Sequence, residues 1–186
     1  AAVKAAWTVA LWGGAWGMYS LVRRWIAESW QERATQRQGA RVATTTAYAS
    51  MAALIAALLY TYAPYHLLDI YVRAALAETM MMAWFPWVCL AFDWLIVRGS
   101  DAGWQGRLLV AALVYAALLL THTFALVAFT PLLAAFALFR IWTVWRREEE
   151  TPGAATLPDR NVALGRLVLL AGGAGIAALL LAAIFL

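Results

Sequence analysis

An all-α fold, a polytopic bundle of transmembrane helices, is what this sequence predicts, and three observations lead to it. Hydrophobic residues make up 65% of the chain and charged residues only 13%. Apolar runs of about 20 residues, the length that crosses a bilayer as a helix, recur along the chain. No stretch alternates in the manner of an amphipathic strand. We therefore expect one transmembrane domain over residues 1–186 with about six visible spans and a short interfacial helix on the outer face.

The charged and cysteine residues narrow the class of protein further. The net charge is +4, but the arginines are dispersed between apolar runs rather than gathered on one basic face, which argues against nucleic acid as a partner. The single cysteine, Cys89, lies within an apolar run, so neither an intrachain disulfide nor a cysteine-based metal site can form. Membrane lipid is the expected surrounding and partner of such a chain.

The first span is expected over about 5–22. Gly13 and Gly17 have the small-xxx-small spacing that lets two helices approach closely. A polar stretch rich in arginine follows, and its apolar residues are spaced to form one face of a helix lying on the membrane surface. Those residues are Trp25, Ile26 and Trp30.

The second span is expected over about 42–62 and the third over about 74–97. Pro86 should kink the third span, because proline removes a backbone donor from the helix. Asp93 lies inside this span, within about a turn and a half of Arg98. We therefore expect its carboxylate to snorkel toward the interface and to be satisfied there.

The apolar run from Leu108 to Trp145 is too long for one span and too short for two full spans with a loop. Its main polar interruption is Thr121-His122-Thr123, which predicts one span over about 107–121 and another over about 124–145. The last span is expected over about 167–186. Its closely spaced glycines suit tight packing. They are Gly172, Gly173 and Gly175.

Because six spans would alternate in direction across the membrane, each polar loop can be assigned to one side of it. Twelve of the 14 lysines and arginines fall in the loops after the first, third and fifth spans, and the other side holds only Lys4 and Arg73. By the positive-inside rule the arginine-rich loops are cytoplasmic. Ala1 and the segment 64–73 are then expected on the outer side of a bacterial inner membrane.

The segment 64–73, with Glu78 beyond it, gathers ionisable side chains between two apolar runs. Charges at membrane depth are costly unless paired or wetted, which makes this cluster a candidate functional site. A helical conformation places Asp69 four residues before Arg73 on one face. The alternative is a purely structural ion pair beside a belt of interfacial tyrosines. The candidate substrate-binding residues are Tyr65, His66, Asp69, Tyr71, Arg73, Glu78 and, from the later break, His122.

The two histidines also allow a metal-binding interpretation. Neutral imidazole binds zinc and haem iron, yet neither His66 nor His122 belongs to a histidine-containing ligand motif. A divalent metal is therefore compatible with the chain, but no metal site is identifiable in it. The sequence also lacks a phosphate-binding glycine loop, a GxSxG elbow and an HExxH helix, so no motif supports hydrolytic chemistry.

Three stretches of the chain resemble a known family. They are the run from Tyr62 to Arg73 with Ala75 and Glu78, the later Leu120-Thr121-His122-Thr123 followed by Pro131, and Gly17-Met18-Tyr19 leading to Arg23 and Arg24. This pattern, spread over about residues 11 to 140, resembles that of the 6-pyruvoyl-tetrahydropterin synthase-related membrane proteins, a family of large bacterial membrane proteins. Its members are similar to polytopic glycosyltransferases of the C-type fold, which take sugars from polyprenyl-phosphate donors at the outer face of the membrane.

The resemblance implies a glycosyltransferase-like protein that uses a polyprenyl-phosphate-linked sugar. In such enzymes an outer loop between the first two spans carries the catalytic carboxylate, so the general base is expected upstream of Ala1. The resemblance further implies that Arg73 would hold the donor phosphate and that Asp69 would orient Arg73. Tyr65, His66 and Glu78 would then shape the sugar or acceptor pocket.

Two other functions are left open by the sequence. The chain begins without an initiator methionine and ends within an apolar run, so we expect it to be part of a longer protein. A non-catalytic structural subunit of a larger membrane complex, pigment- or haem-containing complexes included, would also have abundant tryptophan and small-residue helix faces. A lipid or sugar transporter would show paired broken helices, and one break is visible.

Overall fold

The computed structural model describes residues 2–36, 42–98, 102–150 and 157–184. Side chains are described in these ranges except at 30–36, 42–45, 148–150 and 157–160. All of the elements in the described residues are helices, which confirms the predicted all-α class. Their backbone contacts divide the chain into two compact units, Ala1–Trp87 and Val88–Leu186.

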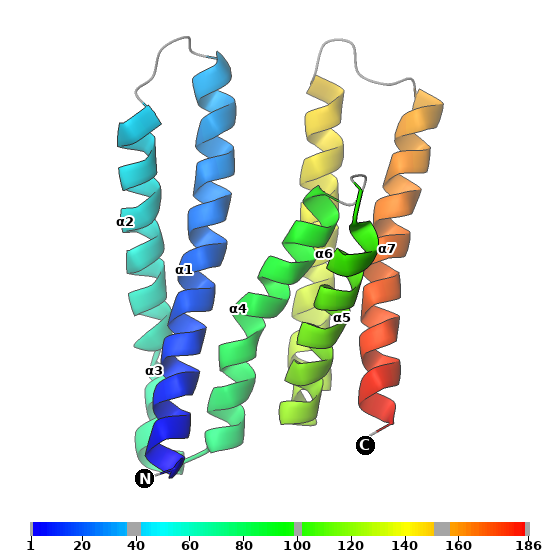
Figure 1. Cartoon of the computed structure of the whole chain (residues 1–186). Coiled ribbons are helices and arrows are strands. Elements are labelled where there is room, and N and C mark those ends of the chain that lie inside the picture. Colours follow the sequence, from blue (N-terminus) through cyan, green and yellow to red (C-terminus); the bar gives the residue numbers. More distant parts are fainter. Residues whose placement is uncertain (1, 37–41, 99–101, 151–156, 185–186) are drawn as a thin grey trace. The chain divides into compact units, whose positions relative to one another are not determined.

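Figure 1 shows the helices in chain order along the ribbon. Two of them, α3 and η1, are short and follow each other directly, and η1 is one wide turn of π-helix. The elements are α1 (Ala2–Gln36), α2 (Val42–Thr61), α3 (Pro64–Leu68), η1 (Asp69–Arg73), α4 (Leu76–Val97), α5 (Trp104–Thr121), α6 (Phe124–Glu150) and α7 (Leu157–Ala183).

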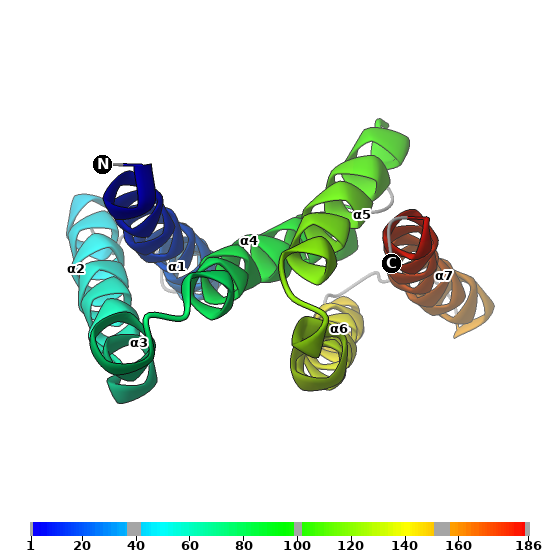
Figure 2. The ribbon, with the colours of Figure 1, turned by 90° about the horizontal axis from the view of Figure 1, so that it is seen from below.

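In the first unit, α1 and α2 form an antiparallel hairpin and lie side by side in both views (Figures 1 and 2). A row of alanines spaced by four residues on α2 is almost fully buried, at 1% exposure for Ala49, 0% for Ala53 and 6% for Ala57. Residues four apart share one helix face, so this row brings the α2 backbone close to its neighbour. The start of α1 and the α3 segment lie at the same end of this hairpin (Figure 1).

Glycines on α1 permit a second close approach, to the first half of α4. A Cβ built on Gly17 would lie 2.9 Å from Nε1 of Trp87 and 3.1 Å from Cβ of Pro86. One built on Gly14 would lie 3.3 Å from Cα of Ala83. The expected pair was Gly13 and Gly17, but a Cβ on Gly13 would meet nothing within 4 Å. Gly14 and Gly17 therefore make the contact.

Two of the described side-chain hydrogen bonds join the first half of α4 to α2 and α1. Pro86 has no N–H to donate to the carbonyl of Met82 four residues earlier, and the hydroxyl of Tyr60 donates to that carbonyl instead (2.7 Å). One residue further on, Nε1 of Trp87 donates to the carbonyl of Gly13 (2.9 Å). Pro86, which was expected to kink this helix, thus leaves the carbonyl of Met82 free to accept the hydrogen bond from α2.

The second unit confirms the predicted break in the long apolar run. Helix α5 ends at Thr121 and α6 begins at Phe124, and the backbone of His122 between them is extended (φ −158°, ψ 127°). The amide of Ala125 donates to the carbonyl of His122 (2.9 Å), and so starts the second helix. The polar Thr-His-Thr interruption is therefore a true helix boundary.

Two expectations for the second unit are wrong. Asp93 was expected to snorkel toward Arg98, but it is completely buried and accepts a hydrogen bond from Nε of Arg140 on α6 (2.5 Å). A buried carboxylate is stable only when a partner compensates its charge, and Arg140, itself only 4% exposed, does so. The three glycines of α7 were expected to pack tightly, but a Cβ on Gly172 or Gly175 would meet nothing within 4 Å, and one on Gly173 would meet only Cδ1 of Leu108, at 4.0 Å.

Among the described residues, four helices are long and apolar enough to cross a membrane. The qualifying stretches are Leu76–Val97, Trp104–Thr121, Phe124–Arg147 and Asn161–Ala183. The bent pair Thr46–Thr61 with Pro64–Arg73 gives a fifth if both parts count as one span. The third span was expected from residue 74, but its helix begins at Leu76 because the chain turns at Ala74.

The expected first span, 5–22, is not among these candidates within the described residues. These residues are helical, as expected, but Trp, Tyr and Gly lower their mean hydropathy. Tryptophan is nevertheless common at membrane interfaces. The separate surface helix expected after it is absent as an element, because α1 continues unbroken to Gln36 and contains Trp25 and Ile26. The side chain of Trp30 lies outside the described residues.

Candidate functional site

The segment between α2 and α4 is shaped by two backbone features. Ala63 is extended (ψ 137°), as a residue before proline prefers, and Pro64 starts α3. After η1, Ala74 adopts the left-handed conformation (φ 50°, ψ 36°), which is unfavourable for a residue with a Cβ. The turn at Ala74 reverses the chain, so that the first turn of α4 faces the end of η1.

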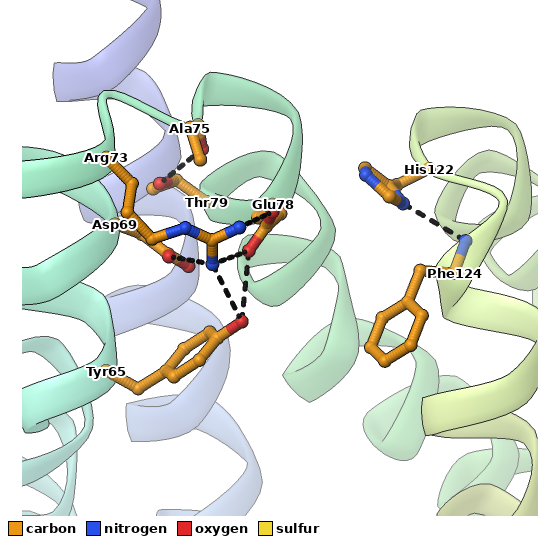
Figure 3. A network of polar contacts seen from close by, with 8 residues as sticks. All are labelled: Tyr65, Asp69, Arg73, Ala75, Glu78, Thr79, His122 and Phe124. Atoms are coloured by element: carbon orange, nitrogen blue, oxygen red, sulfur yellow. Dashed lines mark hydrogen bonds and ion pairs between the residues drawn. The ribbon is translucent and has the colours of Figure 1, made fainter.

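Four side chains meet across this turn, as Figure 3 shows. The Nη1 of Arg73 donates to Oδ1 of Asp69 (3.0 Å) and to Oε2 of Glu78 (2.6 Å), and its Nη2 donates to Oε1 of Glu78 (2.7 Å). The arginine therefore holds Glu78 with two parallel bonds and Asp69 with one. Such charge-assisted bidentate pairs are the strongest hydrogen bonds between side chains.

Tyr65 completes the group. Its hydroxyl donates to Oε2 of Glu78 (3.0 Å) and accepts a longer hydrogen bond from Nη1 of Arg73 (3.3 Å). We call Tyr65, Asp69, Arg73 and Glu78 the acid–arginine cluster. The cluster contains the predicted Asp69–Arg73 pair, and the bidentate Arg73–Glu78 pair is an addition of the structure.

Burial in the cluster is uneven. The side chain of Asp69 is completely buried, whereas that of Arg73 is 45% exposed and that of Glu78 is 16% exposed. One oxygen of Asp69, Oδ2, is buried without a hydrogen-bond donor. Arg73 and Tyr65, the latter 43% exposed, are consequently the parts of the cluster that a bound molecule can reach most readily.

The electrostatics of the segment follow from this burial. Burial raises the pKa of the Asp69 carboxyl above its ordinary value of 3.8; the nearby charge of Glu78 adds to this, and Arg73 opposes it. The hydrogen bond to Glu78 is the largest influence raising the pKa of Tyr65. With Asp69 and Glu78 both ionised, the cluster carries one net negative charge. Protonation of Asp69 makes it neutral.

His66 was predicted in the same site, but its described contacts are with Tyr60 rather than with the four side chains of the cluster. It is 5% exposed, its Nδ1 lies 2.6 Å from the carbonyl oxygen of Tyr60, and its ring meets the Tyr60 ring edge-on at 4.7 Å. Burial lowers the pKa of the imidazole below its ordinary value of 6.5. A neutral ring with hydrogen on Nδ1 satisfies the carbonyl at the end of α2, so its role here is to fasten α3 to α2.

The two other predicted binding residues have different surroundings. Tyr71, on η1, is 82% exposed. His122 belongs to the second unit, where its Nδ1 accepts the backbone amide of Phe124 (3.0 Å), as the close-up in Figure 3 shows. His122 thus satisfies a free donor at the start of α6, the usual task of a capping side chain.

Sequence reasoning missed the pair formed by Asp93 and Arg140. A signal was available, because the predicted topology puts both near the cytoplasmic end of their spans and both lie inside apolar runs. Charges of opposite sign at the same depth in different helices are natural partners. Arg140 was counted only as an arginine of a cytoplasmic loop.

Within the described residues, no group of three or more histidine, cysteine, aspartate or glutamate side chains is arranged to hold a metal ion. Comparison with known proteins adds no relative: no protein family, no curated protein and no solved structure matches the chain.

Proposed function

We propose that this chain belongs to a multi-pass, glycosyltransferase-like protein of the bacterial inner membrane that uses a polyprenyl-phosphate-linked sugar at the outer face. In this proposal α1 is an additional span and the arginine-rich loops are cytoplasmic. The segment 64–73 then lies at the outer boundary, where it contacts the polar head of the donor. The catalytic carboxylate lies in a part of the protein that precedes Ala1.

The observation that carries the proposal is the state of Arg73. Two carboxylates fix the orientation of its guanidinium, yet nearly half of the side chain is exposed. A guanidinium held in one orientation recognises a phosphate with less loss of side-chain entropy than a mobile one. Carboxylate oxygens can accept hydrogen bonds from sugar hydroxyls, and a tyrosine hydroxyl can donate to them or accept from them.

The charge of the cluster limits what it can bind. A site with no net positive charge gives little attraction for a phosphate alone, because the carboxylates already compensate the arginine. We therefore assign the larger part of recognition to the sugar hydroxyls, through Glu78 and the exposed Tyr65. Arg73 contributes a directional hydrogen bond to the phosphate that links sugar and lipid.

The proposal is tested in the complete protein by substituting Arg73 and Asp69 separately. Arg73→Lys keeps the charge but loses the bidentate geometry, and Asp69→Asn removes the buried carboxylate. Each should lower kcat/KM for a polyprenyl-phosphate sugar roughly tenfold or more, the loss expected for a hydrogen bond to a charged group. Arg23→Lys, an exposed arginine of α1 outside the cluster, is the matched control. Undiminished transfer by both variants would remove the proposed site.

A second function is favoured by one specific observation. All of the hydrogen bonds described for Arg73 stay within residues 65–78, so the cluster also suits a clamp that holds η1 against α4. In a non-catalytic subunit of a larger membrane complex, this structural role would be the whole function of the cluster. In that case Arg73→Lys lowers the melting temperature without a defect in sugar transfer, and the protein co-purifies stoichiometrically with other membrane subunits in mild detergent.

A further inference from the structure

The first turn of α5, in the second unit, has properties that the proposed function does not use. The residue before the helix, Gly103, has a left-handed backbone (φ 84°, ψ 16°) and no side chain caps the turn. The amide of Arg107 donates to the carbonyl of Gly103 (3.5 Å), so the amides of residues 104–106 precede the first bond of the helix. Free amides and the helix dipole together favour an anion at such a turn.

Glycines leave the backbone of this turn uncovered. A Cβ built on Gly106 would meet nothing within 4 Å, and one on Gly103 would meet only Nη2 of Arg107, at 3.9 Å. Gln105 and Gly106 are both exposed. A small anionic group can therefore approach the amides closely, which a larger side chain at position 106 would hinder.

A buried arginine beside the turn points independently to an anion. Arg107 is only 7% exposed; its Nη2 donates to the carbonyl of Ala102 (2.7 Å), and its Cζ lies 5.8 Å from the centroid of the Trp94 ring. Its Nη1 is buried without a hydrogen-bond acceptor. Within the described residues, no carboxylate forms an ion pair with this guanidinium. A buried cation without an opposite charge is unfavourable, so the arginine also favours a negatively charged ligand here.

The position of the turn in the chain selects the kind of anion. Trp104 is the first residue of a stretch that is long and apolar enough to cross a membrane, and the preceding stretch of this kind ends at Val97. The start of α5 is therefore expected at a membrane boundary, where the phosphates of phospholipids are concentrated. Basic sites between the ends of transmembrane helices are suited to the head groups of anionic lipids.

We propose that the first turn of α5 binds the phosphate of one anionic phospholipid. The amides of residues 104–106 donate to the phosphate oxygens, and Arg107 supplies positive charge and a donor that is not otherwise used. The carbonyl of Ala102 and the ring of Trp94 hold the guanidinium beside the turn. This phosphate site is separate from the acid–arginine cluster and does not depend on the proposed sugar transfer.

The test measures the lipid retained by the complete protein in mild detergent, by native mass spectrometry. Each protein is incubated with phosphatidylglycerol, which is anionic, or with phosphatidylcholine of the same chains, which has no net charge. Arg107→Gln removes the charge of the site. Gly106→Asp places a carboxylate in the first turn, where it favours the helix but repels a phosphate. Arg166→Gln and Gly165→Asp make the same changes at exposed positions of α7 and are the matched controls.

We expect the wild type to retain roughly fivefold more phosphatidylglycerol than phosphatidylcholine, the preference that one arginine near a lipid surface contributes. Both site variants should lose this preference, and both controls should keep it. Because the carboxylate of Gly106→Asp favours the helix, its melting temperature should not fall, which separates loss of lipid from loss of folding. A Gly106→Asp variant that folds and still retains phosphatidylglycerol like the wild type overturns the proposal.

Two other sources of negative charge are separated by further arms of the assay. If excess inorganic phosphate, at constant ionic strength, removes phosphatidylglycerol from the wild type, the site takes free phosphate and the lipid assignment is overturned. Asp101 lies outside the described residues. If it compensates Arg107, Asp101→Asn lowers the melting temperature as far as Arg107→Gln does and leaves the lipid preference unchanged in both, which also overturns the proposal.

Discussion

His66 illustrates at the scale of one residue how burial decides a role. The imidazole was expected in a binding site, but its contact with the carbonyl of Tyr60 makes it part of the joint between α2 and α3. The neutral ring donates well to that carbonyl. A second proton would place a charge in a buried position, which is unfavourable without a compensating partner.

This residue should give the protein a pH-dependent stability. The pKa of His66 is lowered in the folded state, so the unfolded state binds more protons as the pH falls below 6.5. Stability is therefore fully present above 6.5 and is lost as the pH falls toward the lowered value. His66→Asn keeps a donor near the position of Nδ1 and does not titrate. We expect its melting temperature in detergent to change less than that of the wild type across this window; an equal change in both would contradict the assignment.

The cluster shows which contacts a sequence can predict at this scale. The Asp69–Arg73 pair was predictable because residues four apart share a helix face. The bidentate contact between Arg73 and Glu78 was not, because it depends on the left-handed turn at Ala74. Glycine would have signalled such a turn, whereas alanine rarely adopts it.

At the scale of helices, close approach depends on which glycine faces the neighbour. Gly13 and Gly17 have the spacing of a packing motif, but sequence does not say which face of α1 meets α4. The structure puts Gly14 and Gly17 at the contact and leaves Gly13 with open space. The presence of the motif was therefore predictable, and the residues that use it were not.

The two glycines make a matched pair of substitutions. Gly17→Ala places a methyl group against Trp87 and Pro86 and should cost about 1–3 kcal/mol of stability through overpacking. Gly13→Ala meets nothing and should stabilise the helix by roughly 0.5–1 kcal/mol. Thermal unfolding in detergent compares them. Equal effects of the two alanines would show that α1 does not pack on α4 through Gly17.

Breaking the buried Asp93–Arg140 pair of the second unit should cost more stability than the glycine substitutions. Arg140→Met leaves the fully buried Asp93 without the guanidinium and should cost about 3–5 kcal/mol. Adding Asp93→Leu removes the uncompensated charge, so the double variant should be more stable than Arg140→Met alone. Arg146→Met, at an exposed position of the same helix, should change little. Chemical denaturation in mixed micelles measures the stability of all four variants. If the stability lost in the double variant equals the sum of the losses in the two single variants, the pairing is refuted.

At the scale of the whole chain, hydropathy predicts helices better than it predicts the number of spans. The break at Thr121–Thr123 was predictable because the run around it was too long for one span. The status of α1 was not, because tryptophan and glycine lower its hydropathy while fitting a membrane boundary well. The open space beside Gly172 and Gly175 was also unpredictable, because glycines close in sequence suit tight packing and open space equally.

The proposed position of the acid–arginine cluster, at the outer boundary of a membrane protein, is tested most directly by the side from which its segment is labelled. Cys89 is the single cysteine, so Cys89→Ala provides a background without one. In that background Tyr71→Cys, whose native side chain is 82% exposed, should react with a membrane-impermeant maleimide in intact cells. Ala27→Cys, at an exposed position beyond the expected first span on α1, should react only after permeabilisation. Labelling of position 71 only in permeabilised cells would contradict the claim.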